Sequence, residues 1–120
     1  MTVRRLKSYT GSQGYVYQYY FVGSRPALAA HVGPPATEYV FDVTSDRRIT
    51  FSVSIFLSHD AALAWGASHG RQLTDAEQYA AAKLRLFRGF DEIDNMMTQG
   101  RKLRLDSPLL EELLADAGIS

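Results

Sequence analysis

The chain has 120 residues, carries 13 Lys and Arg against 13 Asp and Glu, and contains no Cys. One domain is the default at this length, and the lack of Cys excludes disulfides, zinc–thiolate centres and thiol nucleophiles. The zero net charge argues against a dedicated nucleic-acid-binding domain, because such domains are usually basic overall.

The N-terminus does not predict a targeting segment. Met1 to Leu6 includes two Arg, but no apolar run follows them. No stretch approaches the roughly 20 apolar residues that a membrane-spanning helix needs. We therefore predict a single soluble domain over residues 1–120, located in the cytoplasm and without a membrane partner.

The N-terminal half has the patterns of β-strands. Apolar residues alternate with Thr and Ser over 49–57, as in a half-buried strand. A strand over 38–44 precedes it, and turn residues between the two predict a β-hairpin. An earlier strand is predicted over 15–22 after a turn at 11–14, with a weaker candidate over 3–9. The Pro-containing segment 23–36 is predicted to be a long connection.

Parity constrains the register of this hairpin. The apolar face of each strand consists of odd-numbered residues, and residues that pair across a sheet share a face. We therefore predict an odd-numbered loop or a bulge, with Val43 opposite either Phe51, around a three-residue loop, or Ile49, around a five-residue loop. The three-residue form would place Arg48 near the left-handed region of backbone conformation.

Two short helices are indicated by their end signals. Ser58 is predicted to cap a helix that ends near Ser68, with Gly70 as its stop. Ser107 and Pro108 are predicted to begin a second one, which runs through about residue 117.

A longer helix is predicted between them. Thr74 and Glu77 match the capping box, and the helix is expected to run to about Gln99, where Gly100 would end it. Its apolar stripe, at helical spacing, comprises Leu86, Phe87, Phe90, Ile93 and Met97.

The order of these elements predicts an α+β fold. An antiparallel β-meander of three to four strands in the N-terminal half would pack on two to three C-terminal helices, because runs of strands followed by runs of helices are typical of this class.

The titratable residues predict no catalytic or metal site. His31, His59 and His69 have no spacing that metal-binding motifs use. Neither a metal nor an organic cofactor is therefore expected as a requirement for folding.

A carboxylate cluster on the long helix has two interpretations. Asp91 and Asp94 share a face beside Glu92, and paired carboxylates can bind a divalent ion or act as acid and base. Arg88 lies one turn before them, however, and ordinary surface ion pairs are the favoured interpretation.

An aromatic stripe is the most informative feature for function. Tyr15, Tyr17, Tyr19 and Phe21 share one face of the predicted strand 15–22. The stripe is either part of the core, with its hydroxyls at the sheet margin, or an exposed surface for a partner, a second subunit or a small apolar ligand.

Two functional hypotheses follow from this stripe. The first is a non-catalytic interaction domain that self-associates as a homodimer, or binds another protein, through a face or edge of the sheet. The alternative is a small-ligand-binding or enzyme domain with a Tyr-lined pocket between the sheet and the long helix.

Overall fold

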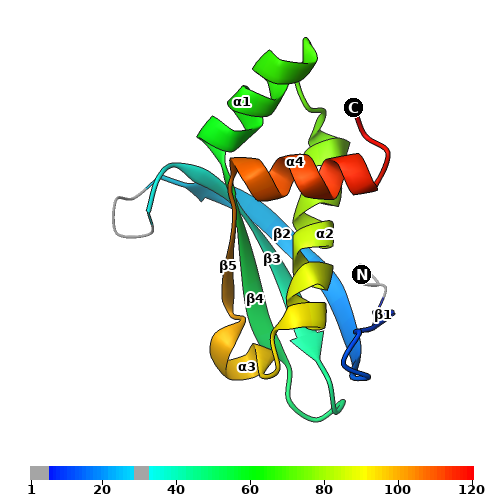
Figure 1. The fold of residues 1–120 in the computed structure, drawn as a ribbon. Helices are drawn as coiled ribbons and strands as arrows, with labels where there is room; N and C mark the ends of the chain where they lie inside the picture. Colours follow the sequence, from blue (N-terminus) through cyan, green and yellow to red (C-terminus); the bar gives the residue numbers. More distant parts are fainter. Residues whose placement is uncertain (1–5, 29–32) are drawn as a thin grey trace.

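The computed structural model describes residues 6–28 and 33–120 (Figure 1). The strands are β1 (Lys7–Thr10), β2 (Val16–Ala27), β3 (Ala36–Thr44), β4 (Phe51–Ser58) and β5 (Lys102–Leu105). The helices are α1 (His59–His69), α2 (Asp75–Glu92), α3 (Met96–Gln99) and α4 (Ser107–Asp116).

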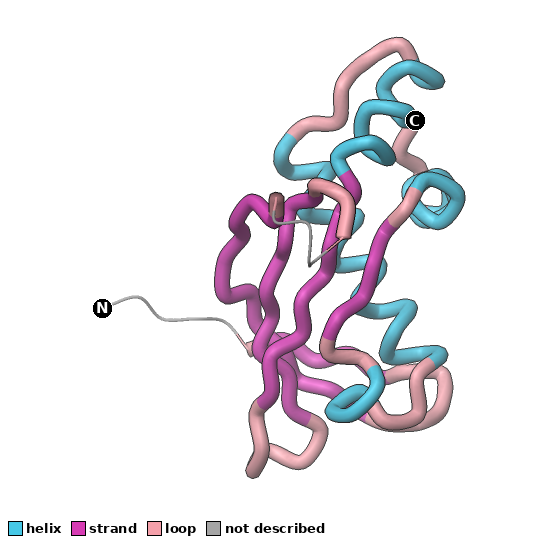
Figure 2. The backbone as a smooth tube through the Cα atoms, turned by 90° about the vertical axis from the view of Figure 1, so that its left-hand side faces the viewer, coloured by secondary structure: helices cyan, strands magenta, loops and turns pink. Residues whose placement is uncertain are grey.

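The strands form one sheet whose spatial order, β1-β2-β3-β4-β5, is the order of the chain. All neighbours are antiparallel except β4 and β5, which run parallel. The helices gather on one side of this sheet, as Figure 2 shows, and α1 packs against α4 at one end of the molecule. The predicted α+β fold is confirmed, and the described residues form five strands and four helices in place of the three to four strands and two to three helices expected.

The register of the β3–β4 hairpin is one of the two that parity allows. Val43 pairs with Phe51, as the three-residue alternative requires. The residue in the left-handed region is Arg47, with φ 64°, and not Arg48. Ile49 lies outside β4, because its backbone N–H donates to the carboxylate of Asp46 at 3.0 Å instead of continuing the ladder.

The predicted long connection over 23–36 contains strand at both ends, over 23–27 and at Ala36. β2 continues to Ala27, which pairs with Ala36 at the start of β3, and a bulge interrupts the ladder between Phe21 and Gly23. Because β1 ends opposite Val16–Tyr19, no strand of the described chain lies on that side of the rest of β2. A proline is tolerated in such an edge segment, which explains how Pro26 can belong to the strand.

The predicted helix starts are confirmed by their caps. The Ser58 side chain caps α1, and Gly70 ends that helix at φ 71°. Both hydrogen bonds of the Thr74–Glu77 capping box are present at the start of α2. Gly118, at φ 78°, follows α4.

The end of the long helix was predicted wrongly. α2 stops at Glu92, and Asn95 begins the separate α3 by accepting a hydrogen bond from the Thr98 backbone N–H at 3.3 Å. Gly100 has φ −116°, so it is not a left-handed stop. The break allows the chain to turn back and add β5 beside β4.

The core lies between the inner face of the sheet and the helices. α2 packs on the inner face of the sheet, with Leu86 and Phe90 fully buried, whereas Phe87 is only partly buried against Tyr9 at a ring-centroid distance of 4.3 Å. Met97, expected on the buried stripe, is 41% exposed. None of the helices in the described chain is both long and apolar enough to cross a membrane.

Candidate functional site

The middle of the aromatic stripe belongs to the core. Tyr17 and Tyr19 are 3% and 4% exposed. The ring of Tyr17 stacks on Phe90 at 4.2 Å, and Tyr19 meets Phe87 edge-on at 5.5 Å. Burial raises the pKa of both phenols. The stripe therefore faces α2, and the opposite side of β2, with Val16 and Tyr20, faces away from the helices.

The two ends of the stripe remain accessible. Tyr15 is 53% exposed and Phe21 is 36% exposed. They lie at opposite ends of the stripe, on either side of the buried Tyr17 and Tyr19. Each contributes to a different hollow in the surface, and these hollows are the candidate sites.

Phe21 lines a cavity of about 380 Å³ between β2, β3 and the first turns of α2, here called the aromatic pocket. Its ring lies 4.9 Å from that of Tyr79 at an interplanar angle of 64°, and 6.3 Å from that of Tyr39. Burial, and then the charge of Asp75, raise the pKa of Tyr39. The full lining is Phe21, Ser24, Thr37, Tyr39, Asp75, Gln78 and Tyr79.

A larger hollow of about 640 Å³ adjoins the aromatic pocket beneath α1, and the two share Thr37 and Gln78. His59 Nε2 lies 3.2 Å from Thr37 Oγ1 at this junction. Leu63, which lines the hollow from α1, is 68% exposed. The hollow combines small apolar side chains with few charges.

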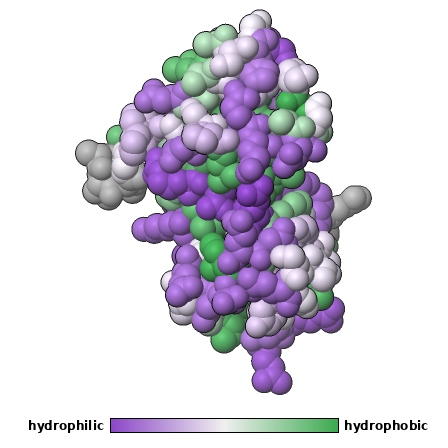
Figure 3. Space-filling view, in the orientation of Figure 1, coloured by the Kyte–Doolittle hydropathy of each residue, from purple (hydrophilic) through white to green (hydrophobic). Residues whose placement is uncertain are grey.

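Tyr15 contributes to the end patch, which we define as the exposed side chains of Tyr15, Ile49 and Met97. These residues are 53%, 53% and 41% exposed and surround a hollow of about 190 Å³. The hollow lies at the lower end of the molecule in Figure 1, where the β3–β4 loop and α3 meet. Figure 3 shows hydrophobic surface among polar residues at this end. The remaining lining is Tyr17, Ser45, Asp46, Phe51, Asp94, Asn95 and Met96.

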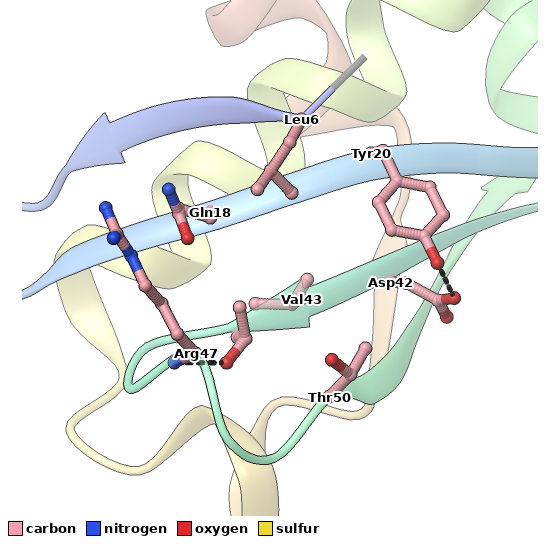
Figure 4. A pocket seen from close by; sticks show the side chains of 8 residues that line it. Leu6, Gln18, Tyr20, Asp42, Val43, Arg47 and Thr50 are labelled. Atoms are coloured by element: carbon pink, nitrogen blue, oxygen red, sulfur yellow. Dashed lines mark hydrogen bonds between the residues drawn. The ribbon is translucent and has the colours of Figure 1, made fainter. Parts of the chain in front are cut away.

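The outer face of the sheet carries another hollow of about 460 Å³, lined mostly by polar residues (Figure 4). Tyr20 Oη donates to Asp42 Oδ2 at 2.8 Å, and Ser52 Oγ donates to the other oxygen at 3.3 Å. The Arg47 side chain extends beside Gln18, on the side of the hollow opposite Tyr20 and Asp42 (Figure 4). These polar side chains are suited to contact with water.

The edges of the sheet are protected against pairing with another strand. On one side, β2 carries the bulge at Val22 and Pro26, both of which oppose strand addition. On the other, the Arg85 side chain donates from α2 to the Arg104 carbonyl of β5 at 2.8 Å. Neither edge presents a long, regular row of backbone groups.

The histidines do not converge. His69 stacks on Trp65 at 4.1 Å and lies 2.9 Å from Glu111 of α4, whereas His59 contacts Thr37. His31 falls outside the described residues. Among the residues that the structure describes, no three His, Asp or Glu side chains are grouped so that they could hold a metal ion.

The carboxylates near the end of α2 separate into different contacts. Asp91 accepts hydrogen bonds from Tyr9 Oη at 2.9 Å and from the Ser12 backbone N–H at 2.9 Å. Arg88 pairs with Glu92 at 3.9 Å and with Glu112 at 3.0 Å. Asp91 thus fastens the β1–β2 turn to α2.

Gly11 permits the β1–β2 turn to approach the backbone of α2 closely. A Cβ at this position would lie 2.7 Å from the Phe90 carbonyl oxygen.

Of the predicted stripe, Phe21 lines the aromatic pocket, and Tyr15 and Tyr17 line the hollow of the end patch, whereas Tyr19 lines neither. The partners of Phe21 and Tyr15 come from strands and helices that the chain brings together only on folding. Ile49 in the β3–β4 loop and Met97 in α3 are exposed apolar residues, but strand alternation placed Ile49, and helical spacing placed Met97, in buried stripes. No protein-family model, curated protein sequence or solved structure matches this chain.

Proposed function

We propose that this chain is a non-catalytic interaction domain that forms a homodimer through the end patch. The observation that carries this proposal is the gathering of Tyr15, Ile49 and Met97 around one hollow, although each is more than two-fifths exposed. Aromatic residues and Met are enriched at the centres of protein interfaces, where their burial contributes most of the binding energy.

The charges around the end patch fit a second copy of the same surface. Asp46 and Asp94 line the hollow. Arg48 precedes Ile49, and the Arg101 guanidinium lies 5.7 Å from the centroid of the Phe51 ring, which also lines the hollow. A two-fold axis brings a patch against itself, so a surface with both signs of charge can be self-complementary.

The alternatives for dimer formation through the sheet are weaker. Tyr17 and Tyr19 are covered by α2, and the outer face has a polar network centred on Asp42. The edges carry protective features. The end patch, by contrast, has an exposed apolar centre that is surrounded by charged residues.

The proposal excludes catalysis because the described side chains do not assemble a nucleophile with an oriented base. The Thr37–His59 contact at 3.2 Å is a hydroxyl–imidazole pair. No hydrogen bond within the described chain orients the other nitrogen of this imidazole, as the third member of a catalytic triad would.

Light scattering at high micromolar concentration tests the dimer. Tyr15→Glu should convert a dimer to a monomer, since it places a charge in the buried centre. Val16→Glu is the matched control, because Val16 is the next residue, is 51% exposed and faces the other side of β2. A monomeric parent chain would overturn the proposal, and so would dissociation by Val16→Glu alone, which would identify the outer face instead.

A second candidate function is a ligand-binding domain that uses the aromatic pocket. Three aromatic side chains from β2, β3 and α2 line this cavity together with a few polar groups, which is the usual composition of a small-molecule site. Titration with a library of small fragments, monitored by amide NMR signals, should perturb Gln78 and Tyr79 first. A library that leaves both signals unchanged would contradict this function.

A cytoplasmic location is part of the proposal. It rests on the lack of Cys in the sequence, since secreted domains of this size often depend on disulfides. Cell fractionation followed by immunoblotting tests it, and recovery of the protein outside the cytoplasm would contradict it.

A further inference from the structure

The aromatic pocket has the chemistry of a site for a positively charged organic group. We infer that it binds a small organic ammonium ion, of which a quaternary ammonium is the simplest form. This inference rests on the second candidate function, and it adds the class of ligand. It does not depend on the dimer.

The rings in the pocket form adjoining walls. The ring centroids of Phe21 and Tyr79 lie 4.9 Å apart with an interplanar angle of 64°, so the two rings are steeply inclined to each other, and both line the pocket. Tyr39 lies 6.3 Å from Phe21 and is itself 7% exposed, which makes it the fixed floor. A cation within about 6 Å of an aromatic centroid is attracted by the negative face of the ring, and several rings around one space add such attractions.

The charge of the lining is negative. Asp75 is the charged residue among those that line the pocket. The neighbouring Arg71 is neutralised by Glu77, to which it donates two hydrogen bonds of 2.8 Å. The positive end of the α2 dipole opposes a cation, but its equivalent of about half a charge is smaller than the full charge of Asp75.

A lysine of the protein, Lys83, lies near the ring of Tyr79 but outside the pocket. The Lys83 ammonium lies 5.8 Å from the centroid of Tyr79, although Lys83 does not line the pocket. The π-system of Tyr79 is thus already within cation–π range of a positive charge. Lys83 also repels a second cation, and this makes it useful for the test.

Other ligand classes fit the pocket less well. An anion at the start of α2 would meet the Asp75 carboxylate, and the capping box already uses the backbone N–H groups of Thr74 and Glu77. A neutral apolar ligand would remove Asp75 from water without giving it a partner. The volume of about 380 Å³ lies near the lower end for small-molecule sites, which favours a compact ligand.

Calorimetric titration of the full chain with choline tests the inference against its uncharged isostere, 3,3-dimethyl-1-butanol. These two probes have the same shape, and choline should bind about tenfold more tightly, because about 1.4 kcal/mol of cation–π and charge attraction is absent from the isostere. Equal affinities would overturn the inference but leave a ligand-binding pocket in place. If neither probe binds, the inference falls, and the fragment titration decides the ligand-binding function separately.

Charge variants give a second readout that a neutral or anionic ligand would not reproduce. Asp75→Asn should weaken choline binding about fivefold to tenfold, whereas Lys83→Gln should strengthen it. Binding that does not change in either variant, or that changes in the opposite directions, would overturn the inference.

Ring variants separate binding from folding. Tyr79→Phe keeps the ring and should retain choline binding, whereas Tyr79→Leu should abolish it. Phe21→Leu is a second test at a position that is 36% exposed and therefore less critical for folding. Retained affinity in both leucine variants, with thermal unfolding unchanged, would overturn the inference.

Two further probes identify the source of the ammonium group. Phosphatidylcholine vesicles and a trimethyllysine peptide carry the same chemistry as choline. Binding of free choline, with neither vesicles nor peptide binding more tightly, supports a free small molecule as the ligand. Tight binding of vesicles or peptide without binding of choline would overturn that assignment.

Discussion

At the scale of single residues, Arg47 is held in a conformation that suits glycine. Among the described residues, Arg47 is the one non-glycine residue with a positive φ, which is 64°. Thr44 Oγ1 accepts the Arg47 backbone N–H at 3.0 Å, and Asp46 accepts the N–H of Arg48 at 2.8 Å. The loop therefore compensates by local hydrogen bonds for a backbone strain of roughly 1 kcal/mol.

Arg47→Gly should raise the free energy of unfolding by up to about 1 kcal/mol, because glycine adopts positive φ without a steric cost. The matched change Arg48→Gly should lower it by about 0.4–1 kcal/mol, since it only adds freedom to the unfolded chain. Urea titrations of the two variants provide the comparison. Equal effects at both positions would show that the backbone at Arg47 is not strained.

Asp91 is a second residue whose loss should have a defined effect. Asp91→Ala should lower the free energy of unfolding by about 1–3 kcal/mol, because Tyr9 Oη and the Ser12 N–H lose a charged acceptor. It should also lower the pKa of Tyr9, which burial and Asp91 raise in the parent chain. NMR titration of Tyr9 measures this change.

Glu92→Ala is the control for Asp91, because Glu92 makes only a 3.9 Å surface ion pair, and it should change stability by less than about 0.5 kcal/mol. A Tyr9 pKa that is the same in Asp91→Ala and in the parent chain would contradict the proposed role of Asp91.

At the scale of elements, the start of α2 combines a cap with an ion pair. The Arg71 side chain, followed by the Thr74 backbone N–H, lowers the pKa of Glu77 from 4.5 to about 2. A carboxylate with a lowered pKa in the folded state stabilises the fold above its unfolded pKa, and this contribution disappears as the carboxylate is protonated.

Glu77→Gln should therefore destabilise the chain at neutral pH, with the difference from the parent shrinking as the pH falls from about 4.5 to about 2. Gln keeps the geometry of the capping box, so the change isolates the charge. Melting temperatures measured across this range test the prediction, and a constant difference at all pH values would refute it. Thr74→Ala, which removes the cap itself, should cost about 1 kcal/mol.

Local signals in the sequence predicted those parts of the fold that local physics determines. The caps at Ser58 and Thr74 and the alternation in β4 depend on near neighbours, and the structure confirms them. β5 was missed because it is only four residues long and is stabilised by parallel pairing with a strand far away in the chain. The end of α2 at Glu92 was also missed because it depends on a distant contact. The break between α2 and α3 allows the chain to turn back, so that β5 can pair with β4.

The candidate sites were less predictable than the fold. The stripe on β2 was recognised, but which face is buried depends on where α2 lies. The aromatic pocket joins Phe21 to Tyr79, and the end patch joins Tyr15 to Met97. No spacing within the sequence encodes these pairs, because each is created by packing between distant elements.

At the scale of the whole molecule, a single hydrophobic cluster connects both ends of the helical layer. Trp65 of α1 belongs to the same cluster as Tyr17 of β2 and Phe90 of α2. Trp65 is the only tryptophan and is 1% exposed, so its fluorescence reports on the α1–α4 end.

Urea unfolding followed by Trp65 fluorescence should coincide with unfolding followed by the near-ultraviolet circular dichroism of the tyrosines. One continuous core is expected to unfold in a single cooperative transition. An earlier transition in the tryptophan signal would show that α1 and α4 separate from the sheet as an independent unit.

The parallel pairing of β5 with β4 has a consequence for protein synthesis. β4 is a run of eight uncharged residues, and β5 begins 44 residues after it ends (102 − 58). At about 5–20 residues per second, a ribosome needs roughly 2–9 s to produce the strand that covers this edge. During that interval a nascent chain presents an apolar edge of the kind that recruits chaperones or aggregates. Chains stalled after Gly100 should therefore bind a general chaperone more strongly than chains stalled with β5 and α4 outside the ribosome.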